Sequence, residues 1–279
     1  MNLNEIWFRL KKSKTGMTGL VIVSIFLFIA ILAPVLAPTG PQESDLAESL
    51  KTPSFNIPFG RDAQGRDILS RVIYGSRLSL IISLGSVVLG IILAVPLGLF
   101  AGYFGGKVDT LIRSLADLML AFPPFLLALS LVAVIGVGMQ NVMISVGIST
   151  TPIYIRLVRG EVMSIKEKEY IMAAKALGKN NFGIIFQHVL RNVYPIIIVQ
   201  STLYMGVALL YSAGLGFLGL GIQPPIPEWG TMLGMGRDYV FAAPHLTIFP
   251  GAAIFFAILG FNLLGDGLRD ALDPHIKGE

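Results

Sequence analysis

The residue types that most often carry out chemistry are scarce in this chain and lie far apart. The three histidines, His188, His245 and His275, occupy three different segments, and no two are four residues apart, which is the spacing of a helical metal pair. Cysteine is absent, so disulfides and thiolate nucleophiles are excluded. No apolar segment pairs a nucleophile with a neighbouring base. The sequence therefore predicts no catalytic residue and no metal site.

Glycine patterns give the same result for nucleotides. The phosphate loop G-x-x-x-x-G-K-[ST] does not occur, and its glycines and lysine are what cradle phosphates. Residues 214–219 match G-x-G-x-x-G literally, but they end an apolar segment instead of following a strand. Glycines in such a place let helices pack closely or bend. No nucleotide site is predicted in this chain.

One set of polar side chains does share a face within an apolar segment. Gln200, Tyr204 and Tyr211 stand at i, i+4 and i+11, on one side of a helix. An amide and two phenols are costly against lipid, so this side is expected to face protein or a hydrated cavity. Two interpretations stay open, helix packing and a substrate path.

These residues belong to a chain of long uncharged stretches. Five of them lack Asp, Glu, Lys and Arg: 15–42, 78–106, 118–155, 192–227 and 239–265. A helix crosses the hydrocarbon core with about 20 apolar residues, and turn signals at 136–141 and after Gly219 interrupt the two longest stretches. Six spans are predicted, near 17–37, 78–101, 113–135, 140–158, 194–218 and 247–267. With 54% hydrophobic and 14% charged residues, the chain is predicted to be an all-α integral membrane protein.

The positive charges sort by loop. With a cytoplasmic N-terminus, fifteen Lys and Arg residues lie inside and six outside. This is the positive-inside pattern, and it places both termini in the cytoplasm. The net charge of +4 thus reflects topology and does not indicate a nucleic-acid partner. The first apolar run is expected to stay as a span, because Pro34 and Pro38 spoil the candidate signal-cleavage sites.

Two substantial segments lie outside the spans, an outer loop at 38–77 and a cytoplasmic loop at 159–192. In the outer loop, Asp67 is placed to cap an amphipathic helix from Ile68 to Ile73. That helix is expected to lie along the outer membrane surface, with Arg66 and Arg71 toward headgroups or protein.

The cytoplasmic loop carries the signals of a helical hairpin. Ser164 and Glu167 have the S-x-x-E spacing of a capping box, and Gly178 fits the left-handed end of that helix. Apolar residues then recur at helical spacing and predict a second short helix: Phe182, Ile185, Phe186, Val189 and Leu190. Three alanines of the first helix form a face that another protein could approach closely: Ala173, Ala174 and Ala176. A plain surface hairpin is the alternative.

The loop and many phrases around it resemble a known family. Residues 169–178, followed by 188–192, resemble the EAA loop of ATP-binding cassette importer permeases. The wider chain resembles the dipeptide, oligopeptide and nickel branch, in the subunit conventionally called C. Its matching phrases follow in order at 59–62, 65–71, 96–98, 101–106, 216–221, 227–230, 261–266 and 268–274.

The resemblance implies a type I importer permease with six transmembrane helices and a coupling hairpin. The chain then divides into 1–75, with the first span and outer loop, and 76–279, the permease core with its EAA-type loop at 159–192. The resemblance also implies a cell-membrane location, a second permease, two ATPases that bind ATP and Mg²⁺, and an extracytoplasmic substrate-binding protein. Eight residues are expected to contact an ATPase: Ser164, Glu167, Glu169, Tyr170, Ala173, Ala174, Leu177 and Gly178.

The expected substrates are dipeptides and oligopeptides, and departures from the family pattern leave nickel as the alternative. Met172 stands where glutamate is usual, Arg191 replaces a proline, and 211–216 differs from the phrase common in peptide members. An ion-coupled secondary carrier is the alternative from another class. Such carriers place ionisable groups near the bilayer midplane, whereas every carboxylate here is predicted near a membrane surface or in a loop.

Two groups of charges border the predicted spans. Asp109, Arg113 and Asp117 share a helix face before the third span. The other group ends the sixth span, where carboxylates oppose the helix dipole and need cations: Asp266, Arg269, Asp270 and Asp273. Each group is interpreted either as local ion pairing or as a latch that changes partners between transport states.

Overall fold

The computed structural model describes residues 3–272, and within this range every regular element is a helix. The only β-type pairing in that range is an isolated bridge between Arg61 and Asp67. The α-helices are α1 (Leu3–Lys12), α2 (Lys14–Ile31), α3 (Ala33–Leu36), α4 (Ile68–Phe104), α5 (Gly106–Leu120), α6 (Pro124–Ile135), α7 (Met139–Ile165), α8 (Glu169–Ala176), α9 (Asn181–Ile184), α10 (Leu190–Phe217), α11 (Trp229–Gly236) and α12 (His245–Leu272). Shorter elements are η1 (Leu46–Glu48), the π-helical η2 (Ile185–Val189) and η3 (Arg237–Tyr239). The all-α prediction is confirmed.

Five helices of residues 3–272 are long and apolar enough to cross a membrane: α2, α4, α7, the continuous run Asn181–Phe217 and α12. The bent pair α5–α6 makes a sixth if it is one span. The span predicted over 113–135 is not one continuous helix, because α5 and α6 meet at an angle of 86°. Pro123 and Pro124 stand at this break, where they cannot supply the amide N–H groups that a continuous helix needs.

The expected helix after Asp67 exists, but it is the first part of α4. The Asp67 carboxylate accepts from the Ser70 amide at 2.7 Å, so the predicted cap is confirmed. The expectation that this helix lies along the outer membrane surface is wrong, since it is the start of the continuous 37-residue α4. Arg71 turns toward protein and is buried, with Nη1 donating to the carbonyls of Pro41 and Pro225.

Small residues let the long helices approach closely. A Cβ at Gly98 of α4 would come within 2.7 Å of the Cβ of Val158 on α7, and one at Gly102 would meet Val162 equally closely. On the other side of the molecule, a Cβ at Gly19 of α2 would lie 2.2 Å from the backbone nitrogen of Leu264 on α12. Close backbone approach at small residues is a common way for membrane helices to pack.

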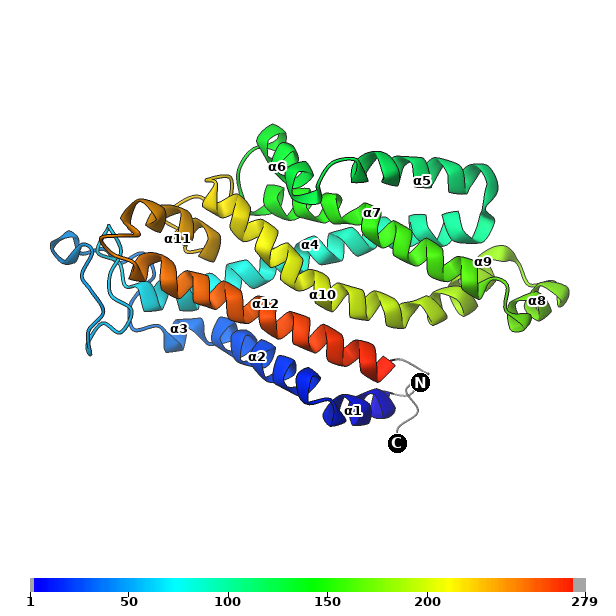
Figure 1. The fold of residues 1–279 in the computed structure, drawn as a ribbon, viewed down its shortest axis with the longest axis horizontal. Helices are drawn as coiled ribbons and strands as arrows, with labels where there is room; N and C mark the ends of the chain where they lie inside the picture. Colours follow the sequence, from blue (N-terminus) through cyan, green and yellow to red (C-terminus); the bar gives the residue numbers. More distant parts are fainter. Residues whose placement is uncertain (1–2, 273–279) are drawn as a thin grey trace.

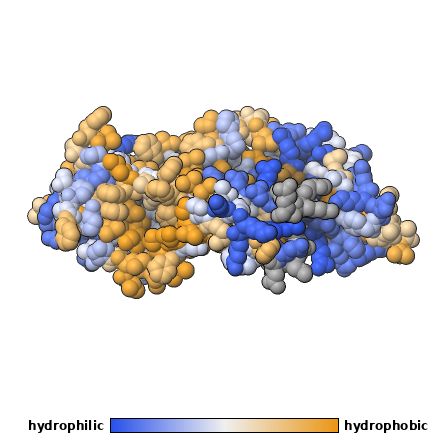
Figure 2. Space-filling view, turned by 60° about the horizontal axis from the view of Figure 1, so that its bottom comes forward, coloured by the Kyte–Doolittle hydropathy of each residue, from blue (hydrophilic) through white to orange (hydrophobic). Residues whose placement is uncertain are grey.

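Most helices run along one long axis, whereas α6 and its connection to α5 lie near the middle of it (Figure 1). The half of the molecule that carries α8 also holds α1, the last turn of α12 and the junction of α4 with α5. The opposite end holds the 37–67 loop and the start of α12 (Figure 1). Figure 2 shows a broad apolar surface between more polar ends, as expected of helices that cross a bilayer.

Candidate functional site

The hairpin between α7 and α10 is the structural candidate for a docking site. Its first helix begins at Glu169, so the capping box predicted at Ser164 is wrong. Ser164 instead lies in the last turn of α7, and Lys168 occupies the N-cap position without a side-chain capping bond. The reason is packing: Val162 and Ile165 are fully buried and keep α7 helical past Ser164.

The end of α8 was predicted correctly. Gly178 has φ of +77°, its amide donates to the Lys175 carbonyl at 3.0 Å, and the Lys179 amide donates to the Ala174 carbonyl at 3.1 Å. These two bonds form a Schellman motif, in which glycine supplies the left-handed residue. The chain can therefore reverse within a few residues.

The second predicted helix is not a separate element. Asn180 caps a helix at Asn181, with its side-chain oxygen accepting from the Gly183 amide at 2.7 Å. That helix continues through the π-helical turn Ile185–Val189 into α10. The apolar spacing located this helix correctly. It did not show that the helix continues into α10, because the buried residues of both belong to one apolar cluster.

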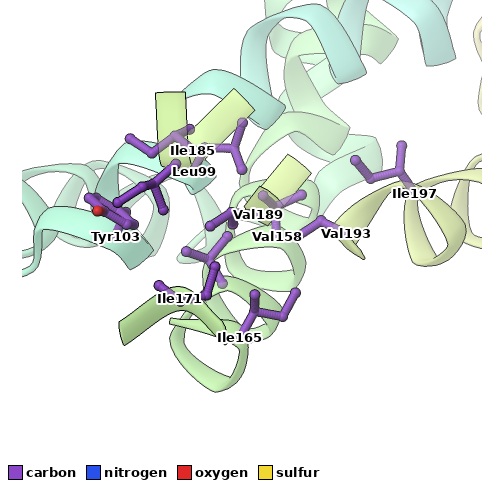
Figure 3. Packing of buried hydrophobic residues seen from close by; sticks show 11 residues of the cluster. Leu99, Tyr103, Val158, Ile165, Ile171, Ile185, Val189, Val193 and Ile197 are labelled. Atoms are coloured by element: carbon purple, nitrogen blue, oxygen red, sulfur yellow. The ribbon is translucent and has the colours of Figure 1, made fainter. Parts of the chain in front are cut away.

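A compact apolar cluster joins the hairpin to the long helices. Ile171 of α8 is fully buried and points into this cluster together with Ile165, Val158 and Val189 (Figure 3). Leu99 and Tyr103 of α4 close its other side. Sequence analysis did not single out Ile171; its signal was a β-branched residue beside alanines in a polar loop. The cluster therefore connects α8 to α4, α7 and α10.

Polar contacts support the same junction. Lys166 Nζ donates to the Gly102 carbonyl at 3.1 Å, and the Tyr103 hydroxyl donates to Asn181 Oδ1 at 3.1 Å. Lys179 Nζ lies 2.8 Å from His188 Nε2. The first two contacts connect both halves of the hairpin to the end of α4, and the third joins the turn after α8 to η2.

Five large apolar side chains of the hairpin are exposed, and we call this set the hairpin face: Tyr170, Met172, Leu177, Phe182 and Phe186. Leu177, at the end of α8, is 88% exposed. Figure 2 shows apolar atoms at this extreme end of the molecule, beyond a polar region. A concentrated apolar surface with a polar surround is typical of a protein-binding site.

The residues predicted to contact an ATPase do not all lie on this face. Ala174 is half-buried and packs against the cluster around Ile171. The others are exposed: Ser164, Glu167, Glu169, Tyr170, Ala173, Leu177 and Gly178. Glu169 occupies the first turn of α8, where a carboxylate interacts favourably with the helix dipole.

Ion pairs connect α5 to α7 close to the hairpin. Asp109 binds Arg159, and Asp117 binds Arg156 with an Nη2–Oδ1 distance of 2.8 Å. The two carboxylates of the charge group predicted before the third span therefore form ion pairs with another helix. In the second group Asp266, Arg269 and Asp270 are exposed on the last turns of α12, and Asp273 lies outside the described residues.

The three candidate path residues lie half-buried along α10. The Tyr204 ring packs on Tyr154 of α7 with centroids 5.1 Å apart, and the Tyr211 ring packs edge-on against Phe125 of α6 at 5.6 Å. The two tyrosines thus contact different helices of this chain. Gln200 continues the same side of α10 toward the hairpin.

A buried carboxylate at the opposite end escaped sequence analysis. Glu228 is 1% exposed and caps α11, accepting from the amides of Gly230 and Thr231 at 2.9 and 2.8 Å. The hydroxyl of Ser79 on α4 donates to it at 3.2 Å. Burial raises the pKa of the Glu228 carboxyl, and these donors oppose the rise. Within residues 3–272 no group of three or more His, Asp or Glu side chains is placed to hold a metal.

Comparison with known proteins identifies the family. Residues 94–278 match the family described as binding-protein-dependent transport system inner membrane component, and residues 2–53 match the N-terminal TM domain of oligopeptide transport permease C. The chain belongs to this family of membrane permeases. Its hairpin thus sits in a transport subunit, and the resemblance seen in the sequence is confirmed.

Relatives of this permease match it over nearly their whole length. It is 48% identical to the dipeptide transport system permease protein DppC of Alkalihalophilus pseudofirmus, covering 98% of this chain and 90% of the relative. It is 43% identical to the di/tripeptide transport system permease protein DppC of Pseudomonas aeruginosa, covering 99% and 93%. The glutathione transport system permease protein GsiD of Pectobacterium atrosepticum is 41% identical, with 98% and 91% covered.

The permease fold also has a solved counterpart. A chain of the MetNI methionine ABC transporter, in an inward facing conformation, superposes with a TM-score of 0.60 at 17% sequence identity. The match covers 74% of this chain and 98% of that one. At this identity the likeness concerns the fold, which is that of an ABC importer permease.

Proposed function

We propose that this permease forms half of the pore of an ATP-driven importer that carries dipeptides and oligopeptides across the cell membrane. The relatives named for dipeptide, di/tripeptide and glutathione transport support a peptide substrate, because all three ligands contain peptide bonds. These relatives align along at least nine-tenths of their length, so the likeness includes the spans as well as the hairpin.

The hairpin is the proposed contact with an ATPase subunit, which binds ATP and Mg²⁺ in place of this chain. The observation that supports this proposal is that the hairpin face is exposed while the hairpin itself is packed against the long helices. Leu177 is free to enter a groove of the partner, while Ile171 is fully buried among residues of three long helices. Movement of the ATPase would thereby be passed to α4, α7 and α10.

The remaining partners follow from this arrangement. One hairpin engages one ATPase, so an importer with two ATPases needs a second permease, for which we propose a different protein of the same kind. α1 and the last turn of α12 lie in the half of the molecule that carries the hairpin (Figure 1), which supports a cytoplasmic location for both termini. The substrate-binding protein would then dock at the opposite end, on the 37–67 loop.

Nickel import by the same machinery and ion-coupled transport are the competing functions. Uptake of a labelled dipeptide by the reconstituted complex, competed by unlabelled peptide but not by Ni²⁺, is the expected result. Competition by Ni²⁺ alone would favour nickel. Uptake driven by a proton gradient without ATPase subunits would overturn the ATP-driven assignment.

A single substitution tests the coupling surface. Leu177→Asp should abolish peptide uptake and the co-purification of the ATPase while leaving the permease inserted, because a charge cannot enter an apolar groove without loss. Leu46→Asp is the matched control for ATPase co-purification alone, since Leu46 is an exposed leucine (72%) at the other end of the molecule, in the loop where the substrate-binding protein is proposed to dock. Normal ATPase binding by the Leu177→Asp complex would contradict the proposal.

A further inference from the structure

The N-terminal helix α1 carries aromatic and cationic side chains that no described contact of the fold requires. Trp7 and Phe8 are 45% and 59% exposed, and Lys11 and Lys12 are exposed beside them. The opposite side of α1 holds Leu10, which is 5% exposed and packs against the close contact of α2 with α12. One side of α1 is thus fixed to the protein and the other is open.

The open side is ordered as two aromatic–cation pairs. Lys11 Nζ lies 5.0 Å from the centre of the Trp7 ring, and Lys12 Nζ lies 4.7 Å from the centre of the Phe8 ring. Each pair is spaced i, i+4, so the rings and the ammonium groups point the same way. An amphipathic body with a charged tip suits the boundary between acyl chains and headgroups.

The position of α1 along the chain supplies the second argument. Lys14 is the first residue of α2, and residues 15–42 carry no charge. The membrane boundary therefore falls at the junction of α1 and α2, and Figure 1 shows α1 at that foot of α2, beside the last turn of α12. A helix held at this level has headgroups as its neighbours.

The net positive charge of residues 3–14 favours anionic lipid headgroups. Residues 3–14 carry four cations, Arg9, Lys11, Lys12 and Lys14, against the single carboxylate of Glu5. We propose that the open side of α1 is a binding surface for anionic lipid, with Trp7 and Phe8 at the acyl boundary and Lys11 and Lys12 on the phosphates. This contact with lipid would hold the N-terminal end of α2 and the C-terminal end of α12 at the headgroup level of the membrane.

Tryptophan fluorescence of the full chain in vesicles tests this surface. The chain has two tryptophans, and Trp229 is fully buried, so the difference between the wild type and Trp7→Phe isolates the signal of Trp7. Vesicles of phosphatidylcholine and phosphatidylglycerol are prepared with either lipid brominated near the headgroup, at equal mole fraction. Bromine quenches an indole only on close approach.

The expected result is that brominated phosphatidylglycerol quenches Trp7 about threefold more than brominated phosphatidylcholine, since each cation near the surface favours anionic lipid. The ratio should fall to about one in Lys11→Gln/Lys12→Gln or in high salt. Lys107→Gln/Lys168→Gln removes the same charge from exposed positions elsewhere and should keep the ratio. Equal quenching of Trp7 by both brominated lipids in the wild type would overturn the proposal. Quenching by aqueous acrylamide but by neither lipid would also overturn it. Quenching by neither acrylamide nor lipid would overturn it as well, and would mean that protein covers α1. The readout does not depend on transport.

Discussion

Arg159 of α7 forms a bidentate ion pair with Asp109 of α5. Nε donates to Oδ1, and Nη2 donates to Oδ2 at 2.7 Å. The two side chains are only 19% and 18% exposed. Bidentate pairs between arginine and a carboxylate fix geometry as well as adding energy. This pair therefore sets how α5 lies against α7, close to the hairpin.

Asp109→Asn should lower the stability of the permease by about 1.5–3 kcal/mol, the usual contribution of a hydrogen bond to a charged group. The matched control is Asp117→Asn, because the Asp117–Arg156 pair is 51% and 63% exposed and exposed pairs contribute about 0–1 kcal/mol. Melting temperatures of the purified complex report both. Equal losses from the two variants would show that the Asp109 pair has no special role.

Ile171→Ala should destabilise the hairpin junction by about 2–5 kcal/mol, the range for removing a buried aliphatic side chain. The neighbouring residue supplies the control: Met172 is exposed, so Met172→Ala should change stability by less than about 0.5 kcal/mol. Limited proteolysis of the 166–180 segment measures the loosening directly. Resistance of Ile171→Ala to the protease would argue against an anchor at this position.

Gly19→Leu should displace α2 from α12, because even its Cβ would lie 2.2 Å from backbone atoms of Leu264. Backbone cannot yield as a flexible side chain can, so we expect severe loss of folded protein. At Gly160 of α7 no atom lies within 4 Å of an added Cβ, and Gly160→Ala should be neutral or stabilising by up to about 1 kcal/mol. The yield of monodisperse protein in detergent separates the two outcomes.

The sequence predicted those features that depend on neighbouring residues. The uncharged stretches gave the spans, Asp67 gave the start of α4, and Gly178 gave the end of α8, since each signal lies within a few residues of its effect. Periodicity also located the second hairpin helix, although not its continuity with α10.

The features that it missed depend on distant partners. For Arg71 the sequence left headgroups and protein as alternatives, and the deciding contact includes the carbonyl of Pro225, 154 residues away. The false cap at Ser164 has a similar cause, because burial of Ile165 keeps α7 helical beyond it. The bend between α5 and α6 is a different case, because Pro123 and Pro124 mark it locally, but the apolar residues on both sides favoured a single span.

Glu228→Ala should destabilise the permease by about 1–3 kcal/mol or more, since it leaves the buried amides of Gly230 and Thr231 without acceptors. Glu228→Gln keeps an acceptor and should be far milder. Because burial raises the pKa of Glu228 above its ordinary 4.5, the folded state holds this proton more tightly than the unfolded chain. Its contribution is therefore complete below pH 4.5 and is lost as the pH rises through the raised value.

The melting temperature as a function of pH tests this assignment. The wild type should lose stability above pH 4.5 relative to Glu228→Gln, whose curve should lack this component. Identical pH profiles would mean that the carboxyl titrates normally in the folded protein.

The side of α10 that carries Gln200, Tyr204 and Tyr211 is the candidate substrate path. If this side lines the substrate path, an amide and two phenols could bind the peptide backbone without selecting a particular side chain. The chain has no natural cysteine, so cysteine at each of the three positions gives an unambiguous accessibility signal with a charged thiol reagent. We expect labelling that changes between ATP-bound and nucleotide-free complexes, most strongly at 200, because the two tyrosine rings pack against Tyr154 and Phe125.

Two control positions on α10 show what the labelling means. Val199→Cys replaces a buried residue and should stay unlabelled, and Leu210→Cys replaces an exposed apolar residue that should be shielded by lipid or by the second permease. Labelling at 200, 204 and 211 but not at the controls would place water along this side of α10, where a polar substrate needs it. Absence of labelling at all three positions in every nucleotide state would leave them as packing residues, and the peptide would have to pass along another helix face.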